Sequence, residues 1–197
     1  MRVVHINTFD RGNGAAEAAY RLHSAQRKKG IDSWMFVQRK LGDDPYVIGP
    51  EGRWDKLFAM IRPYIDALPK YLDSTSNDYY NDISWLPNTR IKWIKSLKPD
   101  VVHLHWINGG FLSIASLASF KMPLVWTCHD TWPLTGIRHY PVIDFKNGHP
   151  VVSDDITPEL YRKSWLNQSV IQRKKRAWKD INMAALAPSL WMEQQLR

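Results

Sequence analysis

Histidine and aspartate side chains gather at two places where an apolar run of the sequence ends. His103 and His105 alternate at the end of one run, and His129 with Asp130 follows another. Imidazole and carboxylate groups can move protons or hold a substrate hydroxyl group by hydrogen bonds. These residue types therefore indicate acid–base or hydrogen-bonding chemistry, provided that the fold brings the two run ends together.

A third polar segment follows the first apolar run, where Asp10 precedes the sequence Gly12-Asn13-Gly14. Glycines let backbone amides approach a ligand, and the helix expected to start here has a positive end suited to phosphate. The segment does not match a dinucleotide-binding fingerprint, because Glu17 stands where a third glycine belongs. Two interpretations of this segment remain open: it binds another kind of phosphate-bearing ligand, or it is only a turn that leads into a helix.

The sequence favours neither a metal site nor a thiol nucleophile at these positions. A His-x-His pair needs a third ligand for zinc, and no acidic residue or second cysteine stands beside His103 and His105. We therefore expect no metal, a hydrogen-bonding role for His105 and a packing role for His103. Cys128 and His129 are neighbours in an extended segment, so their side chains point to opposite faces and a catalytic Cys–His pair is not expected.

Strands and helices alternate along the chain, which predicts an α/β fold. We expect a doubly wound, mostly parallel Rossmann-like sheet with helices on both faces, formed as a single domain by residues 1–197. Ligands of such folds bind outside the carboxyl ends of the strands, where the three polar segments lie. The stretches 38–52, 69–87 and the segment from His129 to 158 are expected to be loops. Apolar runs predict strands at 2–6, 33–37, 100–105, 124–127 and 183–187, and helical spacing predicts helices at 15–29, 54–68, 88–97, 111–120, 158–180 and from 188 onward.

Two of the predicted helices carry side chains suited to contact with other molecules. The helix over 54–68 has an apolar stripe, which we expect to pack on the sheet. The helix over 158–180 could face solvent, phospholipid headgroups or RNA, although no RNA-binding motif occurs in the sequence. Besides Trp165 and Trp178, it carries seven basic residues: Arg162, Lys163, Arg173, Lys174, Lys175, Arg176 and Lys179.

The composition is that of a folded, basic protein. Of the 197 residues 44% are hydrophobic and 23% are charged, which excludes disorder of the whole chain. A net charge of +8 favours polyanionic partners such as an anionic membrane surface, nucleic acid or phosphorylated small molecules. Because the sequence has no run long enough for a spanning helix, no secretion signal and a single cysteine, we expect a cytoplasmic protein without disulfides.

Several short segments, taken together in their order and spacing, resemble a known family. They are similar to the N-terminal half of family 4 glycosyltransferases, which have the GT-B fold. The stretch from His129 to Gly136 further resembles a subgroup that builds bacterial polysaccharides, including colanic-acid-type enzymes. The resemblance runs along the whole chain and is carried by residues 3–8, 12–16, 99–106, 123–130 and 187–189.

The resemblance implies the acceptor-side domain of a retaining hexosyltransferase without a cofactor or metal. The donor would be a nucleotide-sugar, and the acceptor a saccharide or a lipid-linked molecule for cell-surface polysaccharide. Contact with the inner face of the cell membrane is then expected, and nucleic acid is not. Gly12 and Gly14 would lie against the donor diphosphate, the catalytic His105 beside the reacting hydroxyl group, and His129 with Asp130 in the acceptor pocket.

The remaining candidate ligand-binding residues are Asp10, Asn13, Trp106, Asn108 and Trp132, where each tryptophan could stack on a sugar ring or pack on the core. Complete enzymes of this family have a second domain with the nucleotide pocket, so residues 1–197 are expected to be a fragment that is inactive alone. Two alternatives stay open: a sugar-nucleotide epimerase of the same fold, and a non-catalytic basic module that binds anionic lipid or nucleic acid.

Overall fold

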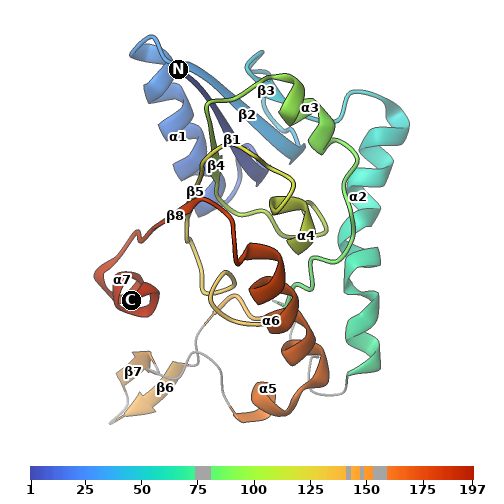
Figure 1. The fold of residues 1–197 in the computed structure, drawn as a ribbon, viewed down its shortest axis with the longest axis vertical. Helices are drawn as coiled ribbons and strands as arrows, with labels where there is room; N and C mark the ends of the chain where they lie inside the picture. The colour runs from blue at the N-terminus through green and yellow to red at the C-terminus, as the bar shows by residue number, and fades with distance from the viewer. Residues whose placement is uncertain (74–80, 141–142, 147–148, 153–158) are drawn as a thin grey trace.

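The computed structural model of the chain is built on a six-stranded parallel sheet. It describes residues 1–73, 81–140, 143–146, 149–152 and 159–197. The strand order is β3-β2-β1-β4-β5-β8, and every pair in this sheet is parallel (Figure 1). The Rossmann-like α/β fold expected from the sequence is confirmed. The strands are β1 (Arg2–Phe9), β2 (Asp32–Arg39), β3 (Val47–Ile48), β4 (Val101–Leu104), β5 (Leu124–Thr127) and β8 (Met183–Leu186).

Helices cover both faces of this sheet. Helix α1 begins at a cap in which the Asn13 side chain accepts a hydrogen bond from the Ala16 amide, and it packs Ala19 against Met35 of β2. On the opposite face, Trp126 of β5 contacts Trp178 of α6 with ring centroids 5.3 Å apart. The helices are α1 (Gly14–Lys28), α2 (Arg53–Ala67), the 3-10 helix η1 (Leu68–Leu72), α3 (Ile91–Ser96), α4 (Ile114–Leu117), α5 (Glu159–Lys163), α6 (Trp165–Trp178) and α7 (Leu190–Leu196).

Two stretches predicted to be loops contain strands, and one predicted helix is divided. The short β3 lies within 38–52, and β6 (Ile143–Lys146) pairs antiparallel with β7 (His149–Val152) after His129. The basic helix is split into α5 and α6 at Ser164, whose hydroxyl caps α6 and donates to the Asp73 carboxylate at 2.6 Å. Its expected start at 158 lies outside the described residues.

Helix α2 turns its apolar stripe away from the sheet, so the expectation that this stripe packs inward is wrong. Trp54 and Phe58 of the stripe are 74% and 56% exposed, whereas Ile61 and Ile65 are half-buried. Tyr64, at the border of the stripe, is 76% exposed. Helix η1 continues the exposed surface with Tyr71 at 83%. We call this surface the α2 outer face and define it by Trp54, Leu57, Phe58, Tyr64, Leu68 and Tyr71.

Polar groups hold the inner side of α2 to the rest of the protein. The Asp66 carboxylate accepts hydrogen bonds from the Ser84 and Trp85 amides at 2.9 and 3.0 Å. The Arg62 guanidinium donates to the Gly110 carbonyl at 2.6 Å. The buried backbone groups of residues 84–86 and 110 need hydrogen-bond partners. Because Asp66 and Arg62 provide them, the polar side of α2 faces the rest of the protein.

The basic residues of α6 do not form one exposed face. Lys174 is buried beneath Trp132, and Arg173 donates to the Ile83 carbonyl at 3.1 Å. Lys175 and Arg176 are exposed. The prediction that these four consecutive basic residues share one binding surface is therefore wrong, because Lys174 is buried.

Candidate active site at the carboxyl edge of the sheet

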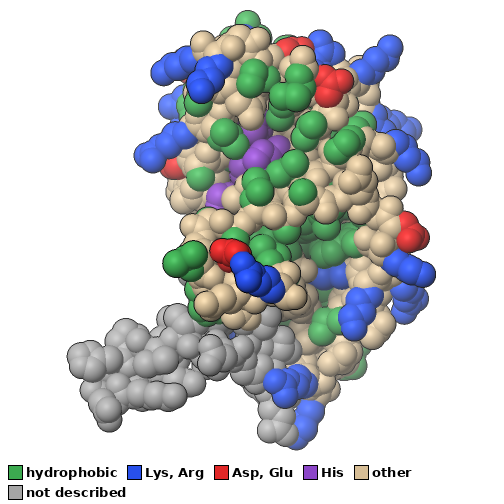
Figure 2. All heavy atoms as spheres, turned by 60° about the vertical axis from the view of Figure 1, so that its left-hand side comes forward, with side chains coloured by type: hydrophobic (Ala, Val, Ile, Leu, Met, Phe, Trp, Pro, Cys, Tyr) green, Lys and Arg blue, Asp and Glu red, His purple; other side chains and the backbone are tan. Residues whose placement is uncertain are grey.

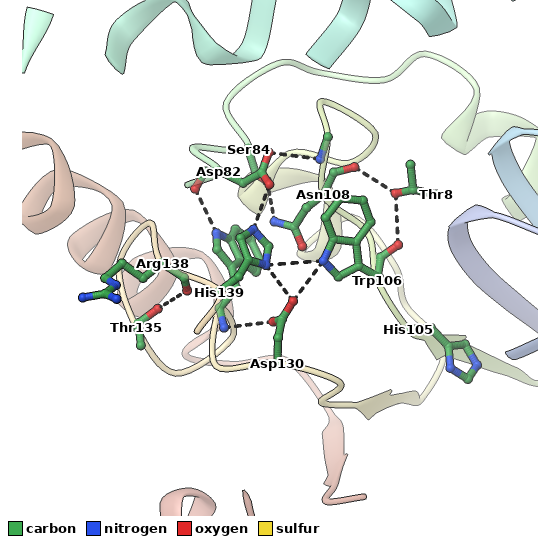
Figure 3. A network of polar contacts seen from close by, with 12 residues as sticks. Thr8, Asp82, Ser84, His105, Trp106, Asn108, Asp130, Thr135, Arg138 and His139 are labelled. Atoms are coloured by element: carbon green, nitrogen blue, oxygen red, sulfur yellow. Dashed lines mark hydrogen bonds and ion pairs between the residues drawn. The ribbon is translucent and has the colours of Figure 1, made fainter. Parts of the chain in front are cut away.

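The polar segments after β4 and β5 meet at the carboxyl edge of the sheet. His105 Nδ1 and His129 Nε2 lie 3.1 Å apart. The Trp106 indole N–H donates to the Asp130 carboxylate at 2.9 Å (Figure 3). The Thr8 hydroxyl, near the end of β1, donates to the Trp106 carbonyl at 3.0 Å. Neighbouring parallel strands end at the same edge, which is why residues about a hundred positions apart in sequence come together here.

Three imidazoles form a hydrogen-bonded row that starts in α1 and ends at the edge of the site. The Gln26 side-chain oxygen lies 2.9 Å from His5 Nε2, and His5 Nδ1 lies 3.1 Å from His105 Nε2. The row continues to His129 through His105 Nδ1. His105 is therefore buried with both ring nitrogens engaged, while His129 is half-buried. Figure 2 shows histidine side chains gathered on one face among hydrophobic ones.

The amide at the start of the row sets the tautomer of each ring in it. A side-chain oxygen of Gln26 can only accept, so His5 carries its proton on Nε2 and offers Nδ1 as an acceptor. The same logic places a proton on Nε2 of His105 and of His129. Among the residues that the structure describes, none bonds to Nδ1 of His129, so its lone pair can accept a hydrogen bond from a hydroxyl group.

Burial keeps these rings neutral. Removal from water lowers the pKa of His5 to about 3, and it lowers the pKa values of His105 and His129 as well. A neutral imidazole can accept one hydrogen bond and donate another, which is what the row requires.

One group of described side chains could hold a metal ion, and it includes the predicted catalytic histidine. One nitrogen from each of His5, His103 and His105 lies within 4.8 Å of the others. The row already pairs two of these rings, and His103 bonds to the Thr127 hydroxyl at 2.8 Å. Hydrogen bonds thus satisfy the cluster without an ion, and the absence of a metal stays a prediction.

A second network joins Asp130 to residues that sequence reasoning missed. His139 lies between two carboxylates, with Nδ1 2.6 Å from Asp130 and Nε2 2.8 Å from Asp82. Burial lowers the pKa of His139, but hydrogen bonds and charge attraction from Asp130 and Asp82 outweigh it and raise the pKa to about 9. This imidazolium ties together the segments after β5 and before α3, and it orients Asp130 toward Trp106 (Figure 3).

Comparison with known proteins identifies the family of this chain. A family model described as Glycosyltransferase Family 4 matches residues 12–194. The chain belongs to Glycosyltransferase Family 4. Searches of curated proteins and of solved structures found no match. The family 4 domain is thus a module of a transferase, a class of enzyme that uses a sugar donor and an acceptor.

The remaining predicted residues of the family 4 domain lie near this edge in different settings. The Asp10 carboxylate accepts from the Leu41 and Gly42 amides at 2.7 and 2.8 Å, so the Gly12 loop rests on the turn after β2. Gly12 has a φ of +94°, which favours glycine there. Gly14 opens α1 behind the Asn13 cap. The role of these residues in donor binding stays a prediction.

Asn108 and Trp132 of the family 4 domain are buried, and their polar groups bond to the protein. Asn108 donates to the Ser84 hydroxyl at 3.2 Å, and the Trp132 indole N–H donates to the Asp82 carbonyl at 2.9 Å. Trp132 is fully enclosed, whereas Trp106 is half-buried. Of the two predicted stacking residues, Trp106 is the one that keeps some contact with solvent.

Raising the pH is expected to destabilise the domain through His139. Its pKa rises from 6.5 unfolded to about 9 folded, so the stabilisation is complete below about pH 6.5 and is lost as the pH rises through 9. The shift corresponds to about 3 kcal/mol of unfolding free energy. Urea unfolding across this range measures it. The variant His139→Asn should lack the decline between pH 6.5 and 9, and a parallel decline in both proteins would contradict the assignment.

Proposed function

We propose that this chain is the acceptor-side domain of a retaining glycosyltransferase in bacterial cell-surface polysaccharide synthesis. It would transfer a sugar from a nucleotide-sugar to a saccharide or lipid-linked acceptor. The observation that carries the proposal is the meeting of His129, Asp130 and Trp106 at the carboxyl edge of a family 4 domain. There the half-buried Trp106 would offer an apolar surface and Nδ1 of His129 a hydrogen-bond acceptor for a sugar hydroxyl, while Asp130 holds Trp106 in place.

The proposed reaction needs little proton chemistry from the protein. The acceptor oxygen forms a bond to the anomeric carbon while the bond from that carbon to the donor diphosphate breaks. The hydroxyl proton passes to the leaving phosphate, so the domain has to orient the hydroxyl group rather than remove its proton. His129 suits this role because the row through His105 and His5 fixes its tautomer.

Gly12 and Gly14 would approach the diphosphate from the loop before α1, at the positive end of that helix. The nucleotide itself would bind to a second domain, and we expect no turnover by residues 1–197 alone.

Saccharide binding to this edge can be tested on the chain by NMR. The Trp106 indole N–H, assigned with a Trp106→Phe variant, should shift on addition of acceptor-type oligosaccharides because it bonds to Asp130 within the site. The indole of Trp93, which is 57% exposed on α3, is a matched internal control and should not move. No shift at Trp106 across a broad oligosaccharide panel would contradict the proposed site.

Replacing His105 is expected to remove transferase activity in a protein that also carries the donor domain. His105→Asn interrupts the row that orders His129, and the loss should reach about a hundredfold or more in kcat. The fold should persist by circular dichroism, and Leu190→Ser, at an exposed position on α7, should leave activity unchanged. Retained activity would remove His105 from the site, and turnover of radiolabelled nucleotide-sugar without any acceptor would favour an epimerase instead.

A further inference from the structure

We propose that the α2 outer face binds to the surface of an anionic lipid bilayer. The inference rests on the proposed function only in that a lipid-linked acceptor must be met at a membrane. Within the described part of the chain, no helix is long and apolar enough to cross a bilayer. Contact would therefore occur through a helix that lies along the surface.

The α2 outer face consists of large apolar side chains on one side of a helix. Trp54, Leu57, Phe58 and Leu68 recur at helical spacing, and each is more than two-fifths exposed. The opposite side carries the buried Ala59 and the polar anchors of the helix. A soluble helix normally places its apolar side against the core, so this reversed arrangement leaves an apolar surface without a partner in the described structure.

The chemistry of this surface fits a bilayer interface. Trp54, Tyr64 and Tyr71 combine an apolar ring with a polar group, which is typical of residues at headgroup depth. Arg53 and Lys56 are exposed at one border of the face, one helical turn before Leu57 and Met60. Such a basic border is attracted to anionic headgroups.

The acidic groups of α2 are directed away from the α2 outer face. The Asp66 carboxylate bonds to backbone amides in the interior, and Asp55 borders a shallow hollow with Arg90 and Trp93. Repulsion from anionic lipid is thereby reduced where the helix would touch it. The net charge of +8 also attracts the whole chain to an anionic bilayer over a longer range.

Vesicle binding tests the proposal directly. Liposomes of phosphatidylcholine, with and without phosphatidylglycerol, are sedimented with the chain at low and high salt. The triple variant Trp54→Ser/Phe58→Ser/Tyr64→Ser should bind anionic vesicles at least about tenfold more weakly, because each residue buries a large apolar side chain on insertion. Trp165→Ser and Leu190→Ser replace apolar residues that are exposed on other helices, and they should bind as the unmodified chain does.

A fluorescent probe locates the contact. Burial raises the pKa of the Cys128 thiol to about 12, so an environment-sensitive dye will label a Tyr64→Cys variant at the new cysteine. Emission at that position should shift to shorter wavelength on binding vesicles, and a dye at Leu190→Cys should not respond.

Unchanged vesicle binding by the triple variant would overturn the proposal, as would binding that depends on Trp165. Self-association of the chain that the triple variant abolishes, with no vesicle binding, would assign the α2 outer face to contact between copies and would also overturn it. The Trp106 NMR experiment uses no lipid, so failure here leaves the proposed glycosyltransferase function separately tested.

Discussion

Acidification to about pH 5 is expected to unfold the chain. Burial lowers the pKa of His5 to about 3 and that of His103 to about 4, from 6.5 in the unfolded state. The unfolded chain then takes up protons below about pH 6.5 that the folded chain excludes, so stability is full above that pH and falls as the pH falls. His5 and His103 each remove about 2 kcal/mol by pH 5, and His105 acts in the same direction.

This combined loss of about 4 kcal/mol, increased further by His105, is close to the lower end of the roughly 5–15 kcal/mol that stabilises most domains. Circular dichroism and tryptophan fluorescence against pH should show one cooperative transition near pH 5. The variant His103→Asn, which cannot be protonated, should move the midpoint to lower pH if it folds. NMR signals of the His5 and His103 imidazoles that titrate near 6.5 in the folded chain, or a native spectrum retained at about pH 4, would contradict the expected burial of these rings in the neutral form.

Replacement of Lys174 by Met is expected to cost about 3 kcal/mol of unfolding free energy, roughly 1 kcal/mol for each of three carbonyls that lose their donor. The Lys174 ammonium is buried, donates to the carbonyls of Trp132, Thr135 and Gly136, and lies 3.5 Å from the Trp132 ring centroid. Burial lowers the pKa of Lys174, but three donated hydrogen bonds require the charged form with three protons. Methionine keeps the apolar stem but leaves three carbonyls without a donor.

The neighbouring Lys175 provides the matched control. It is exposed, so Lys175→Met should change stability by less than about 0.5 kcal/mol. Urea unfolding at neutral pH compares the two variants with the unmodified chain. Equal, small effects would mean that the loop from Trp132 to Gly136 does not depend on the ammonium group.

The parallel sheet was predictable because its central strands are buried on both faces. Such strands are continuous apolar runs, and β1, β2, β4 and β5 could be found from these runs alone. The orientation of α2 could not be predicted from the sequence. Helical spacing shows that Trp54 and Phe58 share a side, but the partners of Arg62 and Asp66 lie in segments without periodicity.

The sequence could predict those site residues that follow the ends of neighbouring strands. It could not predict those that depend on which side chains pair across the fold. His105 and His129 follow neighbouring strands, so topology brings them together. His5 lies within β1, and only the pairing of β1 with β4 places it beside His103. The contact of Asp82 with His139 joins two irregular segments, for which the sequence offers no local signal.

The position of β1 in the middle of the sheet has a consequence for synthesis of the chain. It leaves the ribosome before the other strands of this sheet, and one of its edges pairs with β2 soon afterwards. The other edge waits for β4, which begins only at Val101. At roughly 5–20 residues per second this delay lasts several seconds. During that time a nascent chain presents an unpaired apolar strand edge, the kind of surface that molecular chaperones cover.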